Sequence, residues 1–282
     1  MTASTALPAE TRTPAGPGKP SGRRSPRRTS TRSRALSVVG TWAISLAVGI
    51  GLWWLASLLL GPYVMPSPWA TVEALGDLIK RGTLFTAIGA SLQRILSGWA
   101  IGLVVGVPVG ILMGRIRIIR NFLDPYVEIL RFIPAIALVT VMVVWFGIGE
   151  TSKIALIVYT SVFVVVISTT DAALRISNDK VLAARSLGAD GFQVLWTVVL
   201  PSVVPGIITG ARLAMANSFL TIVSAEMVAA RSGLGTIIWT SYSFGRIDWI
   251  FAGIVTLGFL GFLCDRILRI IAARLLGRYI AK

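Results

Sequence analysis

About six long runs of apolar residues, separated by short polar segments, dominate the pattern of this chain. They lie at about 36–60, 95–114, 132–148, 154–170, 201–223 and 249–264. Each run is close to the roughly 20 apolar residues that a helix needs to cross a membrane. The pattern therefore predicts an all-α membrane protein with about six transmembrane helices. Residues 62–85 and 224–247 are mixed in character and are expected to lie outside the spans.

The composition agrees with a chain that lies mostly in lipid. Of its 282 residues 55% are hydrophobic and only 14% are charged, whereas a soluble domain usually carries about 25% charged residues. The chain has no histidine and a single cysteine, Cys264, so metal sites, histidine-based catalysis and an intrachain disulfide are not expected. We expect Cys264 to serve packing. A membrane-embedded enzyme would need clustered acids or a nucleophile–base pair in the spans, and such residues are scattered here.

The net charge of +15 is concentrated in the N-terminal tail and in loops. Residues 1–34 carry eight Lys/Arg against one acid, Glu10, together with five prolines and eleven Ser/Thr. Such a segment cannot bury a core and is expected to be disordered. The predicted division is therefore a disordered basic tail at 1–34 and a transmembrane domain at 35–282. Nucleic-acid binding is not indicated, because basic residues beside a first span are typical of the cytoplasmic side of a membrane protein.

The distribution of Lys and Arg also predicts the orientation. With the N-terminus inside, the inner segments hold nineteen Lys/Arg and the outer segments hold five, leaving out three that lie in or beside spans. Inner loops of membrane proteins carry the excess of positive charge. The count favours cytoplasmic N- and C-termini around six spans.

A four-residue glycine repeat runs along the second span. The repeat consists of Gly98, Gly102, Gly106, Gly110 and Gly114. Small residues at this spacing form one ridge of a helix and let a neighbouring helix approach closely. We interpret the ridge as a helix-packing face; lining of a pore is the alternative.

The segment between the fourth and fifth spans, "AARSLGADGFQVLWTVVLP" (183–201), is too polar to cross a membrane. Its spacing runs Ala183, Ala184, three residues, Gly188, nine residues, Val198, one residue, Leu200 and Pro201. This spacing resembles the "EAA" loop of ABC-importer permeases, written E-A-A, three residues, G, nine residues, I-x-L-P. Two positions depart from it: Leu182 stands for the Glu, and Val198 for the Ile. The resemblance implies a cytoplasmic coupling helix that docks into an ATPase subunit, with six residues of the motif at the contact: Ala183, Ala184, Gly188, Val198, Leu200 and Pro201.

The resemblance extends over roughly residues 60–275. Three stretches, "MPSPWATVEAL" (65–75), "LRFIPAIALVTVMVVWFGIGETSK" (130–153) and "SAEMVAARSGLGTII" (224–238), resemble permeases for sulfonate, taurine, nitrate and bicarbonate uptake. That group also includes permeases for thiamine- and riboflavin-type precursors. The resemblance implies a homodimer of this chain in the bacterial plasma membrane, two copies of a separate ATPase and an external substrate-binding protein. The alternative function, from a different class of proteins, is a membrane scaffold that transports no solute.

The resemblance also implies that transport and ATP hydrolysis belong to different subunits. The sequence contains no G-x-x-x-x-G-K-[ST] phosphate loop, since "GPGKP" (16–20) ends in proline. We therefore expect no cofactor in this chain, with ATP and Mg²⁺ on the ATPase. The chain itself is expected not to be an enzyme.

The charge of Arg212 falls near the middle of the fifth span, about 16 Å along a helix from Pro201. Charges at this depth are costly and are usually functional or paired. Glu226 lies about 21 Å further along the same straight helix, so the two need separate partners. An anion-attracting role in the pathway and a structural ion pair both remain open for Arg212. Together with three other polar residues of this span, they are the candidates for the translocation pathway: Arg212, Asn217, Ser218, Thr221 and Glu226.

Overall fold

The computed structural model describes residues 31–280, with the side chains of residues 40–228 and 230–274. Its helices are α1 (Thr31–Leu60), α2 (Pro68–Lys80), α3 (Thr83–Arg115), α4 (Arg117–Leu130), α5 (Ala135–Phe146), α6 (Glu150–Leu174), α7 (Asn178–Ser186), α8 (Gly191–Val194), the π-helical turn η1 (Leu195–Val199), α9 (Leu200–Ala229), α10 (Leu234–Ser243) and α11 (Ile247–Ile280). The predicted all-α fold is confirmed for these residues. The predicted disordered tail at 1–34 lies outside them, apart from residues 31–34, which belong to α1.

Five helices of the described residues are long and apolar enough to cross a membrane. They are Gly40–Leu60, Thr83–Arg115, Glu150–Leu174, the continuous helix Gly191–Val228 and Ile247–Arg274. A sixth span requires α4 and α5 together, and these two helices meet at an angle of 103°. The third predicted span, about 132–148, holds one helix, α5, but its 12 residues are too few to cross a membrane alone. Pro134 lies between α4 and α5 in an extended conformation, and proline restricts the residue before it to extended backbone, which separates the two helices.

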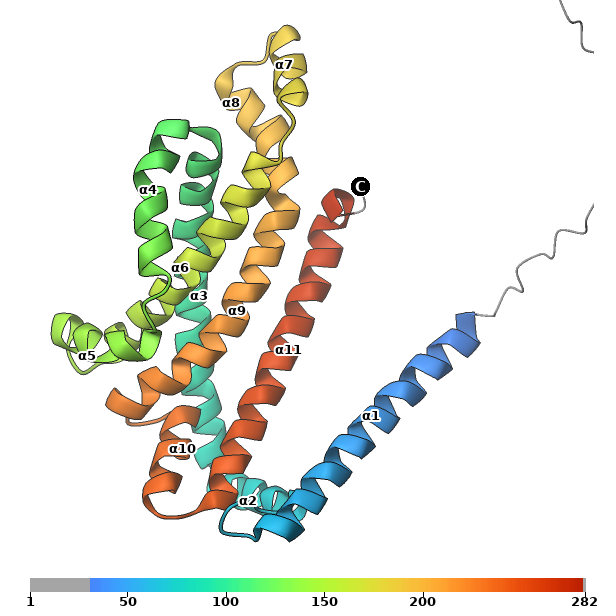
Figure 1. Cartoon of the computed structure of the whole chain (residues 1–282), viewed down its shortest axis with the longest axis vertical. Helices are drawn as coiled ribbons and strands as arrows, with labels where there is room; N and C mark the ends of the chain where they lie inside the picture. Colours follow the sequence, from blue (N-terminus) through green and yellow to red (C-terminus); the bar gives the residue numbers. More distant parts are fainter. Residues whose placement is uncertain (1–30, 281–282) are drawn as a thin grey trace, which may run out of the picture. The chain divides into compact units, whose positions relative to one another are not determined.

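The chain divides by its contacts into residues 1–49 and 50–282, and the packing described here lies within the second unit. In that unit α6 packs between α3 and α9, and α11 lies along α9 (Figure 1). Helices α7 and α8 lie at one end of this bundle, and α2 and α10 lie at the other (Figure 1). We call these the α7 end and the α10 end. The largest apolar cluster draws on α2, α3, α6, α9, α10 and α11, with Leu78, Ile95 and Ile222 at 0% exposure.

The glycine ridge of α3 lies directly against α6. A Cβ atom built on Gly98, Gly102, Gly106 or Gly110 would lie within 2.9 Å of a Cβ atom of α6. The opposing residues also recur every fourth position: Ile157, Ser161, Val165 and Thr169, followed by Ala173 opposite Gly114. The residue numbers increase in the same direction along both helices, so α3 and α6 run parallel and in register. The absence of side chains on α3 allows the backbones to approach this closely.

Gly106→Leu is expected to lower the amount of folded protein in the membrane. The added side chain would meet Val165 and the carbonyl of Val162, and overpacking of this kind costs about 3 kcal/mol. Gly89→Leu is the matched control, because a Cβ on Gly89 of the same helix meets nothing within 4 Å. Membrane yield and thermal stability in detergent measure the effect. Normal accumulation of Gly106→Leu with a changed substrate preference would favour the pore alternative.

Candidate functional site

The segment between α6 and α9 folds into two short helices joined by a sharp turn. Ser177 caps α7 by accepting a hydrogen bond from the backbone N–H of Asp179. Gly188, with φ of +86°, turns the chain at the other end of α7. The N–H of Gly188 donates to the carbonyl of Arg185, and the N–H of Ala189 donates to that of Ala184, which is the Schellman pattern of helix ends. We call residues 178–201 the coupling segment.

The second half of the coupling segment leads into α9 without a break. Asp190 and Gln193 form a reciprocal capping box that starts α8. The π-helical turn η1 follows, in which the N–H of Leu200 donates to the carbonyl of Leu195. Pro201 comes directly after it, at the start of α9, where a missing N–H is tolerated. The predicted polar loop is therefore a helical hairpin fixed by its own caps.

The six predicted contact residues all lie on this hairpin. Their environments differ. Ala183, Val198 and Pro201 line a cavity of about 760 Å³ that also exposes Arg175 and Lys180. Ala184, Val198 and Leu200 pack on the apolar cluster that holds the hairpin to α3 and α6. A Cβ built on Gly188 meets nothing within 4 Å.

The hairpin carries apolar side chains that the rest of the chain leaves uncovered. They are Leu182, Leu187, Phe192 and Trp196, which are 59%, 90%, 69% and 58% exposed. Phe192 and Trp196 contact each other edge to face, with 5.9 Å between ring centroids. We call these four residues the apolar docking face. Exposed large apolar side chains outside the membrane-spanning helices are typical of surfaces that another molecule covers.

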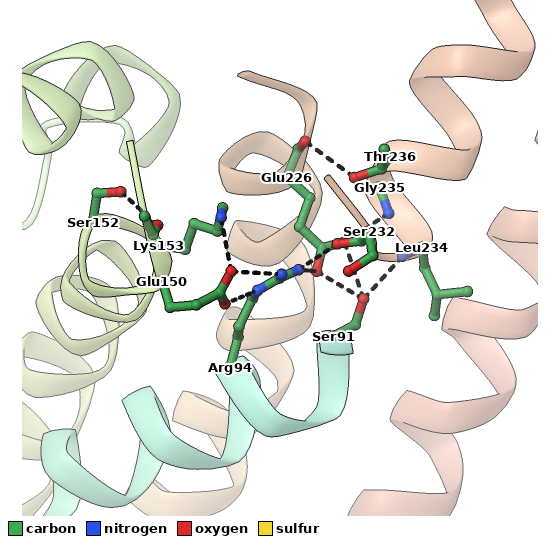
Figure 2. A network of polar contacts seen from close by, with 11 residues as sticks. Ser91, Arg94, Glu150, Ser152, Lys153, Glu226, Ser232, Leu234, Gly235 and Thr236 are labelled. Carbon is green, nitrogen blue, oxygen red and sulfur yellow. Dashed lines mark hydrogen bonds and ion pairs between the residues drawn. The ribbon is translucent and has the colours of Figure 1, made fainter. Parts of the chain in front are cut away.

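A second site, a buried ion-pair network, lies toward the α10 end (Figure 2). At its centre Arg94 of α3 is only 3% exposed. Its Nη1 donates to Glu226 Oε1 at 2.7 Å and to the carbonyl oxygen of Ser232 at 2.6 Å. Its Nε and Nη2 donate to the carboxylate of Glu150, with 2.9 Å from Nη2 to Oε1. Lys153 Nζ donates to the same Oε1 at 3.0 Å, so two cations meet two carboxylates.

Glu226 binds the segment between α9 and α10 to this network. Its carboxylate accepts hydrogen bonds from Ser91 Oγ at 2.8 Å and from the N–H of Gly235 at 2.8 Å. Ser91 Oγ in turn accepts the N–H of Leu234 at 2.9 Å. A Cβ on Gly233 would collide with the carboxylate, which explains a glycine there. The network therefore ties together α3, α6, α9 and the start of α10, as Figure 2 shows.

The five predicted pathway residues do not come together. Arg212 Nε donates to Asp265 Oδ1 of α11 at 2.8 Å, and Glu226 belongs to the buried network. The remaining three contact α6: Asn217 Nδ2 donates to the carbonyl of Thr160, Ser218 Oγ lies 3.0 Å from Ser161 Oγ, and Thr221 Oγ1 donates to Thr160 Oγ1. Ser218, Thr221 and Glu226 are buried within this chain. These contacts hold α9 to its neighbours.

Sequence reasoning missed Arg94, which it placed beside a span without a partner. The available signal was that Glu226 needed a cation and that Arg94 was an unassigned cation near a span. The distance in sequence, 132 residues between Arg94 and Glu226, hid the pairing. No group of three or more His, Cys, Asp or Glu within residues 31–280 is placed to hold a metal ion. Cys264 is half-buried and packs against the largest apolar cluster.

Arg212→Gln is expected to cost about 1 kcal/mol of stability, because the pair with Asp265 is partly exposed. Asp265 keeps Arg269 at 2.7 Å, which limits the loss. The double variant Arg212→Gln with Asp265→Asn should lose less than the sum of the single variants, since the two substitutions remove the same ion pair. Thermal unfolding of the purified protein measures this cycle. Unchanged stability with strongly reduced uptake would instead support an anion-attracting Arg212.

Comparisons with known proteins agree on one family. The model of the binding-protein-dependent transport system inner membrane component family matches residues 106–277. The taurine transport system permease protein of Escherichia coli K12 is 37% identical over 245 residues, which are 84% of this chain and 87% of that protein. The nitrate import permease protein of Leptolyngbya laminosa is 32% identical, over 82% of this chain and 86% of its own. Among solved structures, an inward-facing form of the MetNI methionine ABC transporter matches with a TM-score of 0.58 and 24% identity, over 70% of this chain and 96% of that chain; this match concerns the fold.

Proposed function

Because this chain belongs to the family of binding-protein-dependent transport system inner membrane components, and is thus a permease subunit of an ABC importer, we propose that it forms the translocation pathway for a small organic or inorganic anion. The main support for this substrate class is the 37% identity to a taurine permease over 84% of the chain. The relative for nitrate supports an oxyanionic group as the shared feature, since taurine's sulfonate group and nitrate are both oxyanionic.

We further propose that the coupling segment docks into a separate ATPase, which binds ATP and Mg²⁺. The apolar docking face supports this, since its four side chains are exposed in the chain alone. A helix that presents apolar anchors to a groove is a recurring mode of recognition. The chain's own sequence has no phosphate-binding loop, so hydrolysis belongs to the partner. This division makes the chain a transport subunit without catalytic residues of its own.

The proposed assembly contains two copies of this chain, two ATPase subunits and an external binding protein. The N- and C-termini and the α7 end are cytoplasmic in this proposal, and the α10 end is external. The excess of Lys and Arg in the segments on the α7 side supports the orientation. The basic tail at residues 1–34 then lies in the cytoplasm.

The proposed pathway follows the face of α9 that the chain leaves open. The exposed residues of this face recur at helical spacing: Pro205, Thr209, Leu213, Ala216 and Leu220. At 100° per residue, Arg212 and Asn217 flank this face on its two sides, whereas Ser218 lies on the opposite side of the helix. Within this proposal, Arg212 and Asn217 are the sequence-predicted candidates that border the pathway.

Uptake by the reconstituted assembly tests this proposal. The chain is placed in vesicles with the ATPase and the binding protein encoded beside it, and labelled taurine and nitrate are supplied outside. We expect ATP-dependent uptake of one of these two oxyanion-bearing solutes and none without this chain. Uptake of only a thiamine-type pyrimidine would refute the anion assignment but keep the importer. A chain that assembles with no ATPase would instead be a scaffold.

A further inference from the structure

One side of helix α4 carries all but one of its charged residues. This charged face of α4 consists of Arg120, Asp124, Glu128 and Arg131. At 100° per residue the four side chains fall within an arc of about 80°. The large apolar side chains of α4 lie mostly on the opposite side of the helix, and none of its residues is buried within this chain. The helix therefore separates a charged environment from an apolar one.

The charged face of α4 lies at the depth of the membrane spans. Helix α4 packs against α3 in the half of the bundle nearer the α7 end (Figure 1), and only together with α5 is it apolar enough for a sixth span. Its 14 residues extend about 21 Å. Charged side chains at such depth face water or another charge. Among the described side chains, no ion pair involves the charged face of α4, although the Arg131 guanidinium lies 4.7 Å from the centroid of the Phe132 ring.

A cavity of about 280 Å³ lies beside the charged face of α4, bordered by α3 and α6. All four side chains of this face line the cavity, and Asp171 of α6 adds a fifth charged group. Five of the eleven lining residues are thus charged, as two guanidinium groups and three carboxylates. A lining of this kind needs water, so we expect the cavity to be hydrated.

Asp171 connects this cavity to the proposed pathway. It also lines a second cavity, of about 430 Å³, which lies between α6 and α9. That second cavity includes Pro205 and Thr209 of the open face of α9. Arg175 lines it as well and extends to the cavity at the coupling segment. We call the two cavities that share Asp171 the vestibule; the charged face of α4 then borders the proposed pathway.

We propose that the vestibule receives a solute that carries both an oxyanionic group and a positive group, such as an aminosulfonate. The guanidinium groups of Arg120 and Arg131 bind the oxyanionic group. The carboxylates of Asp124, Glu128 and Asp171 bind the ammonium group. A simple anion is repelled by the three carboxylates, whereas a zwitterion orients so that each of its ends meets the opposite charge. This inference rests on the proposed function and narrows its substrate class.

The first test needs no solute. Cys264 is the only cysteine, so it is replaced by alanine and a single cysteine is introduced at Val127, which lines the vestibule and leaves its charges in place. Membrane-impermeant thiosulfonates, one anionic and one cationic, are added from the α7 side of inside-out vesicles. Both should modify Val127→Cys, at rates within about threefold of each other once each is divided by its rate with a small free thiol.

Ile129→Cys is the matched control, because Ile129 lies on the apolar side of α4 and is 68% exposed. It should react at least about tenfold more slowly with either reagent, since a thiol without water around it stays protonated. If Val127→Cys reacts no faster than Ile129→Cys, the vestibule is not hydrated and the inference fails.

Charge variants of the Val127→Cys chain test the mixed charge. Asp124→Asn should shift the ratio of the two rates about threefold toward the anionic reagent, and Arg120→Gln by a similar factor toward the cationic one. Asp77→Asn, an exposed carboxylate of α2 that does not line the vestibule, should leave the ratio unchanged. A ratio that neither vestibule variant moves would overturn the assignment of these charges.

Uptake by the reconstituted importer gives the second test. With taurine as solute, Asp171→Asn and Arg120→Gln should each lower the uptake rate at least about threefold, because each end of a zwitterion loses one partner. Faster uptake with Asp171→Asn and slower uptake with Arg120→Gln would indicate a pathway for simple anions; that result overturns this inference and keeps the proposed importer. Uptake of neither taurine nor nitrate would refute the proposed substrate class, and the thiosulfonate rates would still decide whether the vestibule is hydrated and of mixed charge.

Discussion

Arg94→Ala is expected to abolish accumulation of the folded protein in the membrane. The change leaves the side chain of Glu226, which is 0% exposed, without its cation. Removal of one partner from a buried ion pair costs about 3–5 kcal/mol, a large part of the whole stability of a typical domain. The loss also frees Glu150 and the carbonyl of Ser232, so the contacts between α3, α6 and the start of α10 fail together.

Membrane yield and thermal stability in mild detergent measure this effect. Arg117→Ala is the matched control, because Arg117 is exposed and forms no ion pair within the described residues. The double variant Arg94→Met with Glu226→Gln should recover part of the yield, because it removes the buried charge along with its partner. If Arg94→Ala accumulates and unfolds like the wild type, the network does not hold the α10 end together.

The apolar spans could be predicted from the sequence alone. The prediction failed where the extent of a helix depends on contacts with residues far away in the sequence. The second span was expected to begin at about residue 95, but α3 begins at Thr83. Arg94 lies within α3, and a lone arginine is costly in a span. Its cost is offset by Glu150 and Glu226, which lie 56 and 132 residues away. No local pattern contains that information.

Other differences had local signals that the hydropathy pattern outweighed. Helix α2 falls in a segment that was expected to lie outside the spans and for which no helix was predicted, although Ser67 followed by Pro68 is a typical helix start. The third predicted span was expected to begin at about residue 132, but Pro134 is the N-cap of α5, which begins at Ala135 and is separate from α4. In both cases the average hydropathy of a window concealed the effect of single residues on the backbone.

The features of the candidate site that depend on residue spacing within one helix could be predicted from the sequence. The glycine ridge of α3 and the position of Gly188 could be read from the sequence because each depends on neighbours a few residues away. The partner of Arg212 could not, since Asp265 lies on another helix. The apolar docking face was also missed, because only the structure shows that Leu187 and Phe192 are uncovered.

Leu187→Glu is expected to abolish the stimulation of ATP hydrolysis by the loaded binding protein. Leu187 is 90% exposed, so the substitution leaves the fold of the chain unchanged and puts a charge into the proposed contact. A charge buried there without a partner is costly. Gly188→Glu should have the same effect, but its φ of +86° adds backbone strain, which makes Leu187 the cleaner position. Gly188→Asn, which tolerates this conformation better, should retain more stimulation than Gly188→Glu.

The measurement that tests the central claim most directly is stimulated ATPase activity in vesicles that contain the whole importer. Asn178→Glu is the matched control, because it adds the same charge to the first turn of α7, where the helix dipole favours it. The account predicts wild-type stimulation with Asn178→Glu and a loss of at least about tenfold with Leu187→Glu, since coupling requires a contact whose energy differs between the two states. Full assembly and full stimulation with Leu187→Glu and Gly188→Glu would show that the coupling segment does not transmit the ATPase cycle to this chain.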